Sequence, residues 1–189
     1  MAMAKSNSFK ESNEKTKIAE YLVATYLSSL GWAFIFVCDN PKYQAMGIDI
    51  ICINRRTGEK ITIEVKSDDR SDTPNFFFET VSNVKKGSTG WSFSTQAQYV
   101  IIFYPLIHTI YILDGQELVA WFCVNHDRQN KYGRNEFFEI TNATKSYDGS
   151  DLYKSKGRLI NREIFRREVG FIDKVIVPDY LITAALAAQ

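Results

Sequence analysis

The stretch GIDIICINRRTGEKITIEVKSDD, residues 47 to 69, decides how the rest of this chain is interpreted. Two runs rich in branched apolar residues, 47–54 and 60–66, flank the polar segment 55–59, which contains a glycine. Runs of this kind are typical of strands, and a short turn-forming segment between two of them is typical of a hairpin. The passage therefore predicts a β-hairpin.

Three charged side chains stand out in this hairpin. Asp49 lies at the start of the first apolar run, where a carboxylate costs several kcal/mol to bury unless a cation or hydrogen bonds compensate it. In the second run, Glu64 and Lys66 are two residues apart, so strand geometry places them on one face, about 7 Å apart at their α-carbons. Asp49 falls at the end of its strand opposite Glu64 and Lys66, so the three side chains can converge.

Two carboxylates beside main-chain carbonyls suit a hard divalent cation. Asp49, Glu64 and the carbonyl of Val65 would supply oxygen ligands of the kind that Mg²⁺ or Mn²⁺ prefers. Such an ion polarises a phosphate and lowers the pKa of an attacking water, while Lys66 can orient that water, take its proton or stabilise charge on phosphoryl oxygens. The alternative is that Glu64 and Lys66 form the solvated face of an edge strand and that Asp49 is a turn residue.

The sequence around the hairpin predicts an α/β domain. Apolar residues recur at three- and four-residue steps from Thr16 to Leu30, which predicts an amphipathic helix that ends at Gly31. Strands are expected at 32–38, at 76–81 as the other edge of the same sheet, at 99–104 and at 108–113, and a helix is expected at 116–124. A basic helical stretch, a strand-like run at 171–177 and a terminal helix after Pro178 are expected in the tail.

Length and composition favour one domain with peripheral additions. The chain has 189 residues, of which 45% are hydrophobic and 14% aromatic, enough for one sizeable core. We expect a disordered tail at 1–13 and a core at 14–124. Residues 125–189 would form a polar excursion and a C-terminal addition on the same domain.

Several classes of protein are not expected. No run approaches the roughly 20 apolar residues of a membrane span, and the N-terminal residues lack the apolar block of a secretory signal, so the expectation is a cytoplasmic protein without membrane contact. The three cysteines are widely spaced and read as free structural thiols, and neither histidine stands near a cysteine at zinc-ligand spacing. A net charge of +1 means that any DNA-binding face must be local.

The hairpin and its surroundings resemble the PD-(D/E)XK nuclease superfamily, which includes restriction endonucleases and Holliday-junction resolvases. The resemblance rests on an acid at the head of one strand, Glu-x-Lys on the next and a preceding helix with an Ala-Glu pair, and it extends to QAQYVIIFY at 96–104. It covers roughly residues 16 to 104. Ile48 stands where the family motif has proline, which is a weak part of the pattern.

The resemblance implies a restriction-endonuclease-like fold, a mixed β-sheet flanked by helices. It also implies that Asp49 and Glu64 bind the metal and that Lys66 assists catalysis. A glutamate of the first helix often joins the site in this family, and that position corresponds to Glu20 in IAEYL. Glu20 could equally be part of the polar side of its helix.

Two basic segments are candidates for contact with DNA. Lys85 and Lys86 precede a glycine- and hydroxyl-rich loop, which could contact phosphates or be an ordinary exposed loop. The stretch 154–167 holds six cations against Glu163 alone, and it is either a DNA-backbone surface or a solvated helix face. Its candidate contact residues are Arg158, Arg162, Arg166 and Arg167.

The leading hypothesis from these features is a metal-dependent endonuclease that cuts DNA with Mg²⁺ or Mn²⁺. One centre cuts one strand, so cleavage of a duplex would favour a homodimer. The alternatives are a catalytically inactive nuclease-like module that binds nucleic acid or a protein, and a structural α/β protein without nucleic-acid function.

Overall fold

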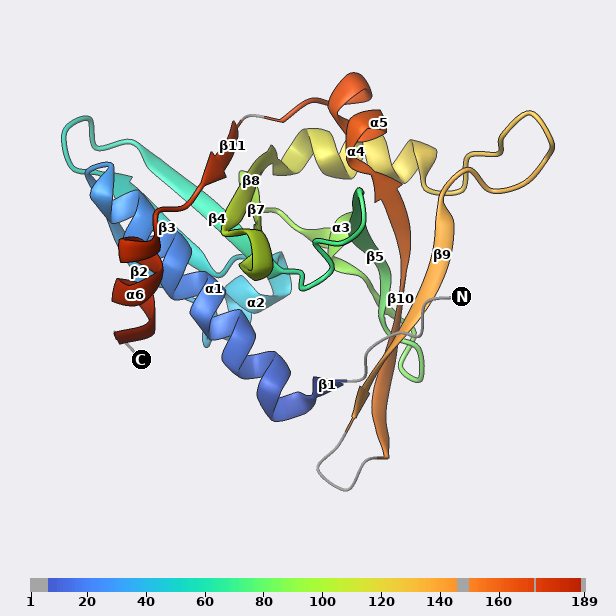
Figure 1. Ribbon diagram of the computed structural model, residues 1–189, viewed down its shortest axis with the longest axis horizontal. Coiled ribbons are helices and arrows are strands. Elements are labelled where there is room, and N and C mark those ends of the chain that lie inside the picture. The colour runs from blue at the N-terminus through green and yellow to red at the C-terminus, as the bar shows by residue number, and fades with distance from the viewer. Residues whose placement is uncertain (1–6, 146–149, 172, 188–189) are drawn as a thin grey trace. The chain divides into compact units, whose positions relative to one another are not determined.

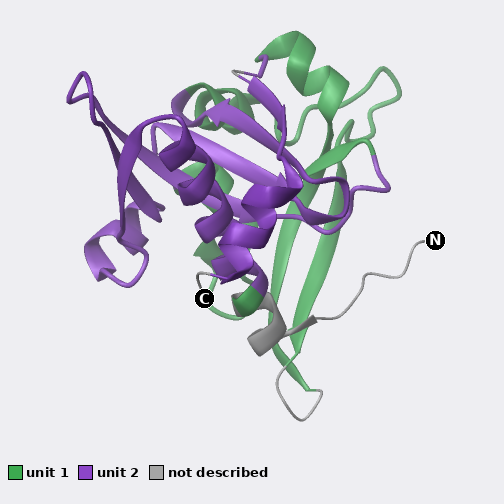
Figure 2. Cartoon of the chain, turned by 60° about the vertical axis from the view of Figure 1, so that its left-hand side comes forward, with its two compact units in different colours: residues 1–14, 74–94, 117–169 green, residues 15–73, 95–116, 170–189 purple. Residues whose placement is uncertain are grey.

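A computed structural model of the chain describes residues 7–145, 150–171 and 173–187, and Figure 1 shows its helices and strands. The chain divides into two compact units, coloured separately in Figure 2. One unit, here the hairpin unit, consists of residues 15–73, 95–116 and 170–189. The second unit consists of residues 1–14, 74–94 and 117–169.

The hairpin unit is built on a six-stranded mixed sheet in the order β11-β8-β7-β4-β3-β2. Neighbouring strands are antiparallel except β4 and β7, which are parallel. The strands are β2 (Trp32–Phe36), β3 (Ile50–Asn54), β4 (Lys60–Ser67), β7 (Tyr99–Tyr104), β8 (Thr109–Asp114) and β11 (Asp173–Ile176).

Helices α1 (Phe9–Ser29), α2 (Pro41–Met46) and α6 (Asp179–Ala187) pack on the sheet of the hairpin unit. The short 3-10 helix η1 (Pro105–Ile107) connects β7 to β8. Apolar residues of α1 and α6 share one core with the inward side chains of β3, β4, β7 and β8, among them Leu22, Ile50 and Ile63. Ile48 and Ile51 belong to a smaller cluster with residues of α2, so β3 is apolar on both faces.

The second unit contains an antiparallel sheet with one short parallel strand at its edge, in the order β1-β9-β10-β5-β6. Its core is aromatic: the Phe78 ring meets the rings of Trp91, Phe122 and Phe165 edge-on at 5.3 to 5.5 Å. Its elements are β1 (Asn7–Ser8), β5 (Asn75–Asn83), β6 (Ser88–Thr89), α3 (Trp91–Ser94), α4 (Gly115–Asn125), β9 (Phe138–Lys145), β10 (Asp151–Asn161) and α5 (Arg162–Glu168).

The predicted class of fold is confirmed. The chain has a mixed sheet flanked by helices, the β3–β4 hairpin is antiparallel as predicted, and β7 and β8 are the expected pair of buried neighbours. The predicted helix α1 ends at Ser29, just before Gly31. In the part of the chain that the structure describes, no helix has the length and apolar character needed to cross a bilayer.

Two predictions about the sheets are wrong. The strand at 76–81 does not form the other edge of the hairpin's sheet, because β5 pairs with β10 in the second sheet. The basic helical stretch expected in the tail from Leu159 onward begins only at Arg162, because residues 151–161 form strand β10. Both errors concern pairing between segments far apart in sequence, and local periodicity carries no information on such pairing.

The boundaries of the chain's parts also differ from the prediction. The predicted disordered tail extended to residue 13, but the structure has Asn7–Ser8 as a strand and starts α1 at Phe9, while residues 1–6 lie outside the described part. The expected division at residue 124 is not where the units separate. Residues 74–94 group with 117–169, because β5 and β10 pair along six positions, and residues 170–189 return to the hairpin unit.

Candidate active site

The hairpin brings Asp49 beside the part of β4 that carries Glu64. The antiparallel register of β3 and β4 ends with Ile50 paired to Ile63, and Asp49 is the next residue outward. The main-chain N–H of Asp49 donates to the carbonyl of Ile63 at 2.8 Å, and its carbonyl accepts from Val37 at 2.8 Å. The backbone of Asp49 is therefore held by both neighbouring segments although it lies one residue before β3.

The side chain of Asp49 completes the hydrogen bonding of β4. Its Oδ2 accepts from the main-chain N–H of Val65 at 2.7 Å, at the point where β3 has not yet begun. A buried N–H without a partner is costly, so this contact both satisfies β4 and fixes the orientation of the carboxylate. The carboxylate therefore points at the segment that carries Glu64 and Lys66.

Glu64 and Lys66 lie on the same face of β4, as their spacing predicts. Ile61, Ile63 and Val65 face the core shared with α1, so the alternate residues face the other way. The ammonium of Lys66 forms an ion pair with Oε1 of Glu64. The Glu64 side chain is only 5% exposed, whereas that of Lys66 is 33% exposed and can reach solvent or a ligand.

Glu20 of α1 is a buried carboxylate that acts on the same group of charges. It is 6% exposed, and burial raises the pKa of its carboxyl. A hydrogen bond from the Cys38 thiol lowers that pKa, and the charge of Glu64 raises it. Of the two alternatives for Glu20, a place in the site or the polar side of its helix, the second does not hold, because the helix turns this residue inward.

Asp49 has the most strongly shifted pKa of the carboxyl groups at the site. Its pKa is raised to about 7, first by burial and next by the Glu64 carboxylate. The Lys66 ammonium and the Val65 hydrogen bond act in the opposite direction, and Glu20 adds a smaller rise. Three carboxylates thus repel one another around one ammonium, an arrangement that a bound cation would stabilise.

The helix that aims Asp49 was not predicted from the sequence. Asn40 caps α2 by accepting from the N–H of Lys42, and the helix ends in a Schellman motif at Gly47. Gly47 donates to the Gln44 carbonyl and Ile48 donates to the Tyr43 carbonyl. The Asn-Pro pair and the glycine that follows are the sequence signals that could have identified α2.

Cys38 also belongs to the surroundings of the site, although its sequence context indicated only a structural thiol. The pKa of this thiol is raised to about 11 by burial and by the nearby carboxylates of Glu20, Asp39 and Asp49. Cys38 is therefore a thiol at neutral pH and donates to Glu20, which the sequence could not indicate because the two residues belong to different elements.

The donor set fits a cation held by two carboxylates rather than three. Among the described residues, no group of three or more His, Cys, Asp and Glu side chains has the geometry to hold a metal ion. Asp49 and Glu64 supply carboxylate oxygens whose charges act on each other, and the carbonyl of Val65 follows Glu64 on β4. Mg²⁺ commonly takes one or two carboxylates and keeps several waters, so this set suits it.

The predicted DNA-contact residues lie in the second unit. Lys85 and Lys86 occupy the exposed turn between β5 and β6, where the Asn83 side chain accepts from the N–H of Lys86 at 3.1 Å. Arg162, Arg166 and Arg167 lie on α5. Glu79, an acid between apolar neighbours, lies on β5 of the second sheet.

The cations of the basic stretch 154–167 have more acidic partners than the sequence indicated. Arg158 is only 9% exposed, and its guanidinium contacts Glu139 at 3.7 Å and the Phe137 carbonyl at 3.4 Å, so it is not available as a surface contact. The other cations also have neighbours. The pairs are Lys154 with Asp151, Lys156 with Glu139, Arg166 with Glu163, Arg167 with Glu168, and Arg162 over the Phe76 ring.

Among solved structures, this chain is partly similar to a bacterial homing endonuclease, I-Ssp6803I, which aligns over 60% of this chain and 70% of its own chain with a TM-score of 0.41 and 15% sequence identity. No protein-family model and no curated protein sequence matches the chain.

Proposed function

We propose that this protein is a metal-dependent nuclease of the PD-(D/E)XK type that hydrolyses phosphodiester bonds in DNA. The observation that carries the proposal is the arrangement of Asp49, Glu64 and Lys66 at one end of the β3–β4 hairpin. Two carboxylates and one ammonium on adjacent strands of a buried sheet have no structural need for one another, because apolar residues of similar size would cost less to bury.

Each residue has a distinct role in the proposed reaction. Asp49 and Glu64, with the carbonyl of Val65, would hold Mg²⁺ or Mn²⁺, which when bound supplies Lewis acidity toward a phosphoryl oxygen and an acidified water. Lys66 is kept beside this point by its ion pair with Glu64, and its partly exposed ammonium can orient the attacking water or stabilise charge on the phosphoryl oxygens.

Glu20 acts behind these groups. It is buried and receives a hydrogen bond from Cys38, so its charge adds to the acidic character of the site from the side of α1. An additional carboxylate whose charge reaches Asp49 favours the binding of a cation at the site. Cleavage of both strands of a duplex requires two such centres, and a homodimer would supply them.

A second candidate is a nuclease-like module that binds nucleic acid or a protein without cutting. The lack of a three-acid cluster among the described residues favours it, because tighter metal sites use more protein ligands. The complete set of Asp49, Glu64 and Lys66 favours the enzyme, because binding alone needs none of them.

The first test is cleavage of linear, circular, single-stranded and branched DNA by the purified protein with Mg²⁺, Mn²⁺ or EDTA. We expect metal-dependent cleavage that falls at least about 100-fold in Asp49→Asn, Glu64→Gln and Lys66→Ala, because each removes a metal ligand or a group acting on the reacting phosphate.

Matched controls lie on the same hairpin. Glu59 and Lys60 are exposed residues at its turn end, so Glu59→Gln and Lys60→Ala remove the same charges away from the site and should leave cleavage within about twofold. Cleavage by wild type that survives in all three site variants, or wild type that cuts none of the four substrates with either metal, would refute the enzyme assignment.

A further inference from the structure

The loop between α4 and β9 is held in a defined conformation by hydrogen bonds among its own residues. The Asn130 side chain accepts from the main-chain N–H groups of Tyr132 at 2.9 Å and Arg134 at 3.3 Å. The main chain of Asn130 donates to the Arg134 carbonyl and accepts from Gly133. Residues 129–135, here the tip loop, therefore form a defined turn closed by a bridge between Gln129 and Asn135.

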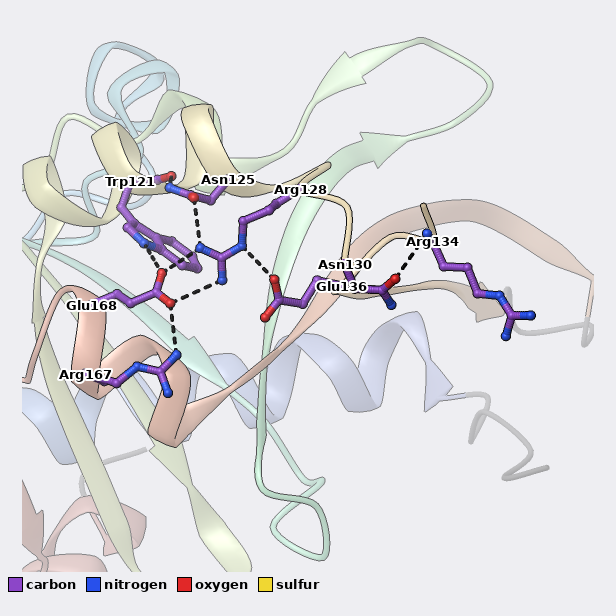
Figure 3. A network of polar contacts seen from close by, with 8 residues as sticks. All are labelled: Trp121, Asn125, Arg128, Asn130, Arg134, Glu136, Arg167 and Glu168. Atoms are coloured by element: carbon purple, nitrogen blue, oxygen red, sulfur yellow. Dashed lines mark hydrogen bonds and ion pairs between the residues drawn. The ribbon is translucent and has the colours of Figure 1, made fainter. Parts of the chain in front are cut away.

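A network centred on Arg128 holds the base of the tip loop, as Figure 3 shows. The guanidinium donates to Glu136 at 2.7 Å, to Asn125 at 3.1 Å and to both oxygens of Glu168 at 2.9 and 3.2 Å. Trp121 also donates to Glu168 at 3.1 Å. These contacts tie the loop to α4 on one side and to α5 on the other.

The network also pairs two acids near the tip loop, Glu136 and Glu168, with arginines. Arg128 engages both Glu136 and Glu168, and Arg167 pairs with Glu168 as well. The hydrogen bond from Arg128 is the largest cause that lowers the pKa of Glu168 to about 2. The charges of Glu136 and Glu168 are therefore paired with arginines at the base of the loop, where Asp127 is exposed.

The tip itself carries cations and an aromatic ring but no acid. Its sequence QNKYGRN contains Lys131, Tyr132 and Arg134, all exposed, with Tyr132 73% exposed. The Lys131 ammonium lies 5.0 Å from the Tyr132 ring centroid, and the Arg134 guanidinium extends away from the Arg128 network (Figure 3). Within the described residues, neither Lys131 nor Arg134 forms an ion pair.

We infer that the tip loop contacts the phosphate backbone of double-stranded DNA, an inference that rests on the proposed nuclease function. Arg134 presents a planar fork that suits a phosphate, Lys131 presents a mobile point charge, and Tyr132 supplies a flat ring against sugar or base edges. Because the loop is already ordered, binding loses less conformational entropy than it would in a flexible basic segment.

A protein partner suits this surface less well. Interfaces between proteins have a largely apolar core, and the tip loop exposes one ring among polar and cationic groups. Phosphate contacts, by contrast, commonly come from arginine, lysine and tyrosine side chains and from loop amides. The tip loop adds contact residues distinct from those that the basic segments indicated.

The test is binding of a labelled DNA duplex by the full chain in EDTA, measured over a series of salt concentrations. In Lys131→Ala/Arg134→Ala we expect affinity to fall about tenfold or more near 0.1 M salt, and the slope of log affinity against log salt to decrease by about 2. Lys131→Arg/Arg134→Lys keeps both charges and should restore most of the affinity.

The matched control is Arg55→Ala/Arg56→Ala, which removes two exposed cations from the β3–β4 turn. The inference is wrong if both double variants lose the same affinity, if the tip variant with an unchanged thermal midpoint keeps the wild-type slope, or if wild type does not bind the duplex. If wild type cleaves DNA and Lys131→Ala/Arg134→Ala binds the duplex as tightly as wild type, the tip-loop inference is rejected and the nuclease proposal stands. Binding through the tip without cleavage under any metal would reject the nuclease.

Discussion

At the scale of single residues, the cluster of Asp49, Glu64 and Glu20 carboxylates works against the stability of the protein. Asp49 is half-buried and faces Glu64, and Lys66 offsets only part of the repulsion. Residues held in such unfavourable surroundings commonly mark functional sites, because the cost is recovered when the ligand binds. The pKa of Asp49 makes this cost measurable.

Asp49→Asn should stabilise the metal-free protein at pH 8 and have little effect near pH 4. A carboxyl whose pKa is raised on folding stabilises the fold while protonated, and that contribution is lost as pH rises from about 4 through about 7. Asparagine cannot ionise, and its oxygen can still accept from Val65. We expect a gain of roughly 1–3 kcal/mol at pH 8, seen as a thermal midpoint several degrees higher in EDTA.

The control for this experiment is Asp127→Asn, at an exposed position with the same change in chemistry. A midpoint for Asp49→Asn that is equal to or lower than wild type at pH 8 would contradict the electrostatic account of the site. Magnesium should raise the midpoint of wild type and not of the variant.

At the scale of elements, the short helix α2 positions Asp49. Its Schellman motif turns the chain at Gly47 so that Asp49 enters the sheet one residue ahead of β3. Gly47 has φ +61, and a Cβ there would lie 3.1 Å from the Thr95 hydroxyl oxygen and 3.2 Å from the Thr95 backbone. The hydroxyl of Thr95 in turn donates to the Gly47 carbonyl at 3.0 Å. Glycine is required here for conformation and for space.

Gly47→Ala should destabilise the protein by roughly 2–3 kcal/mol, since it combines left-handed strain with crowding against Thr95. Gly58→Ala is the matched comparison, because Gly58 has φ +74 with nothing within 4 Å, and only the conformational cost of roughly 1–2 kcal/mol applies. Urea unfolding of both variants measures the difference. Equal losses would show that Thr95 moves aside without cost.

At the scale of the whole molecule, the two units respond to pH in opposite directions. The hairpin unit contains Asp49, whose contribution weakens as pH rises, while the second unit contains Glu168, whose pKa is lowered to about 2. A carboxylate with a lowered pKa stabilises the fold above its unfolded pKa, and the contribution is lost as pH falls. Stability should therefore decline on both sides of an intermediate pH.

Glu168→Gln should lower the thermal midpoint at pH 7 by an amount that shrinks as pH falls from about 5 toward 2. The loss at pH 7 is roughly 1–3 kcal/mol, because the variant removes a bidentate pair with Arg128 that is largely shielded from solvent. Glu163→Gln on the same helix is the control, since Glu163 is 77% exposed and meets Arg166 only at 3.7 Å. A loss that is the same at pH 7 and pH 3 would rule out the ion pair as its source.

What the sequence determined by itself is local. The alternation of residues 61 to 66 placed Glu64 and Lys66 on one face, the turn at 55–59 brought Asp49 opposite them, and the spacing from Thr16 to Leu30 defined α1. These features depend on neighbours within a few residues, where side-chain periodicity follows directly from backbone geometry.

What only the tertiary structure decided is long-range. Glu20 is turned inward and contacts Cys38, and β5 pairs with β10. Acids such as Glu139 pair with cations of the basic stretch 154–167. Each of these contacts is between segments distant in the chain. Local patterns do not encode such partners, because strand register and helix docking are chosen by the packing of the whole core. The same packing determined which cations are paired with acids and which, such as Lys131 and Arg134 of the tip loop, are exposed.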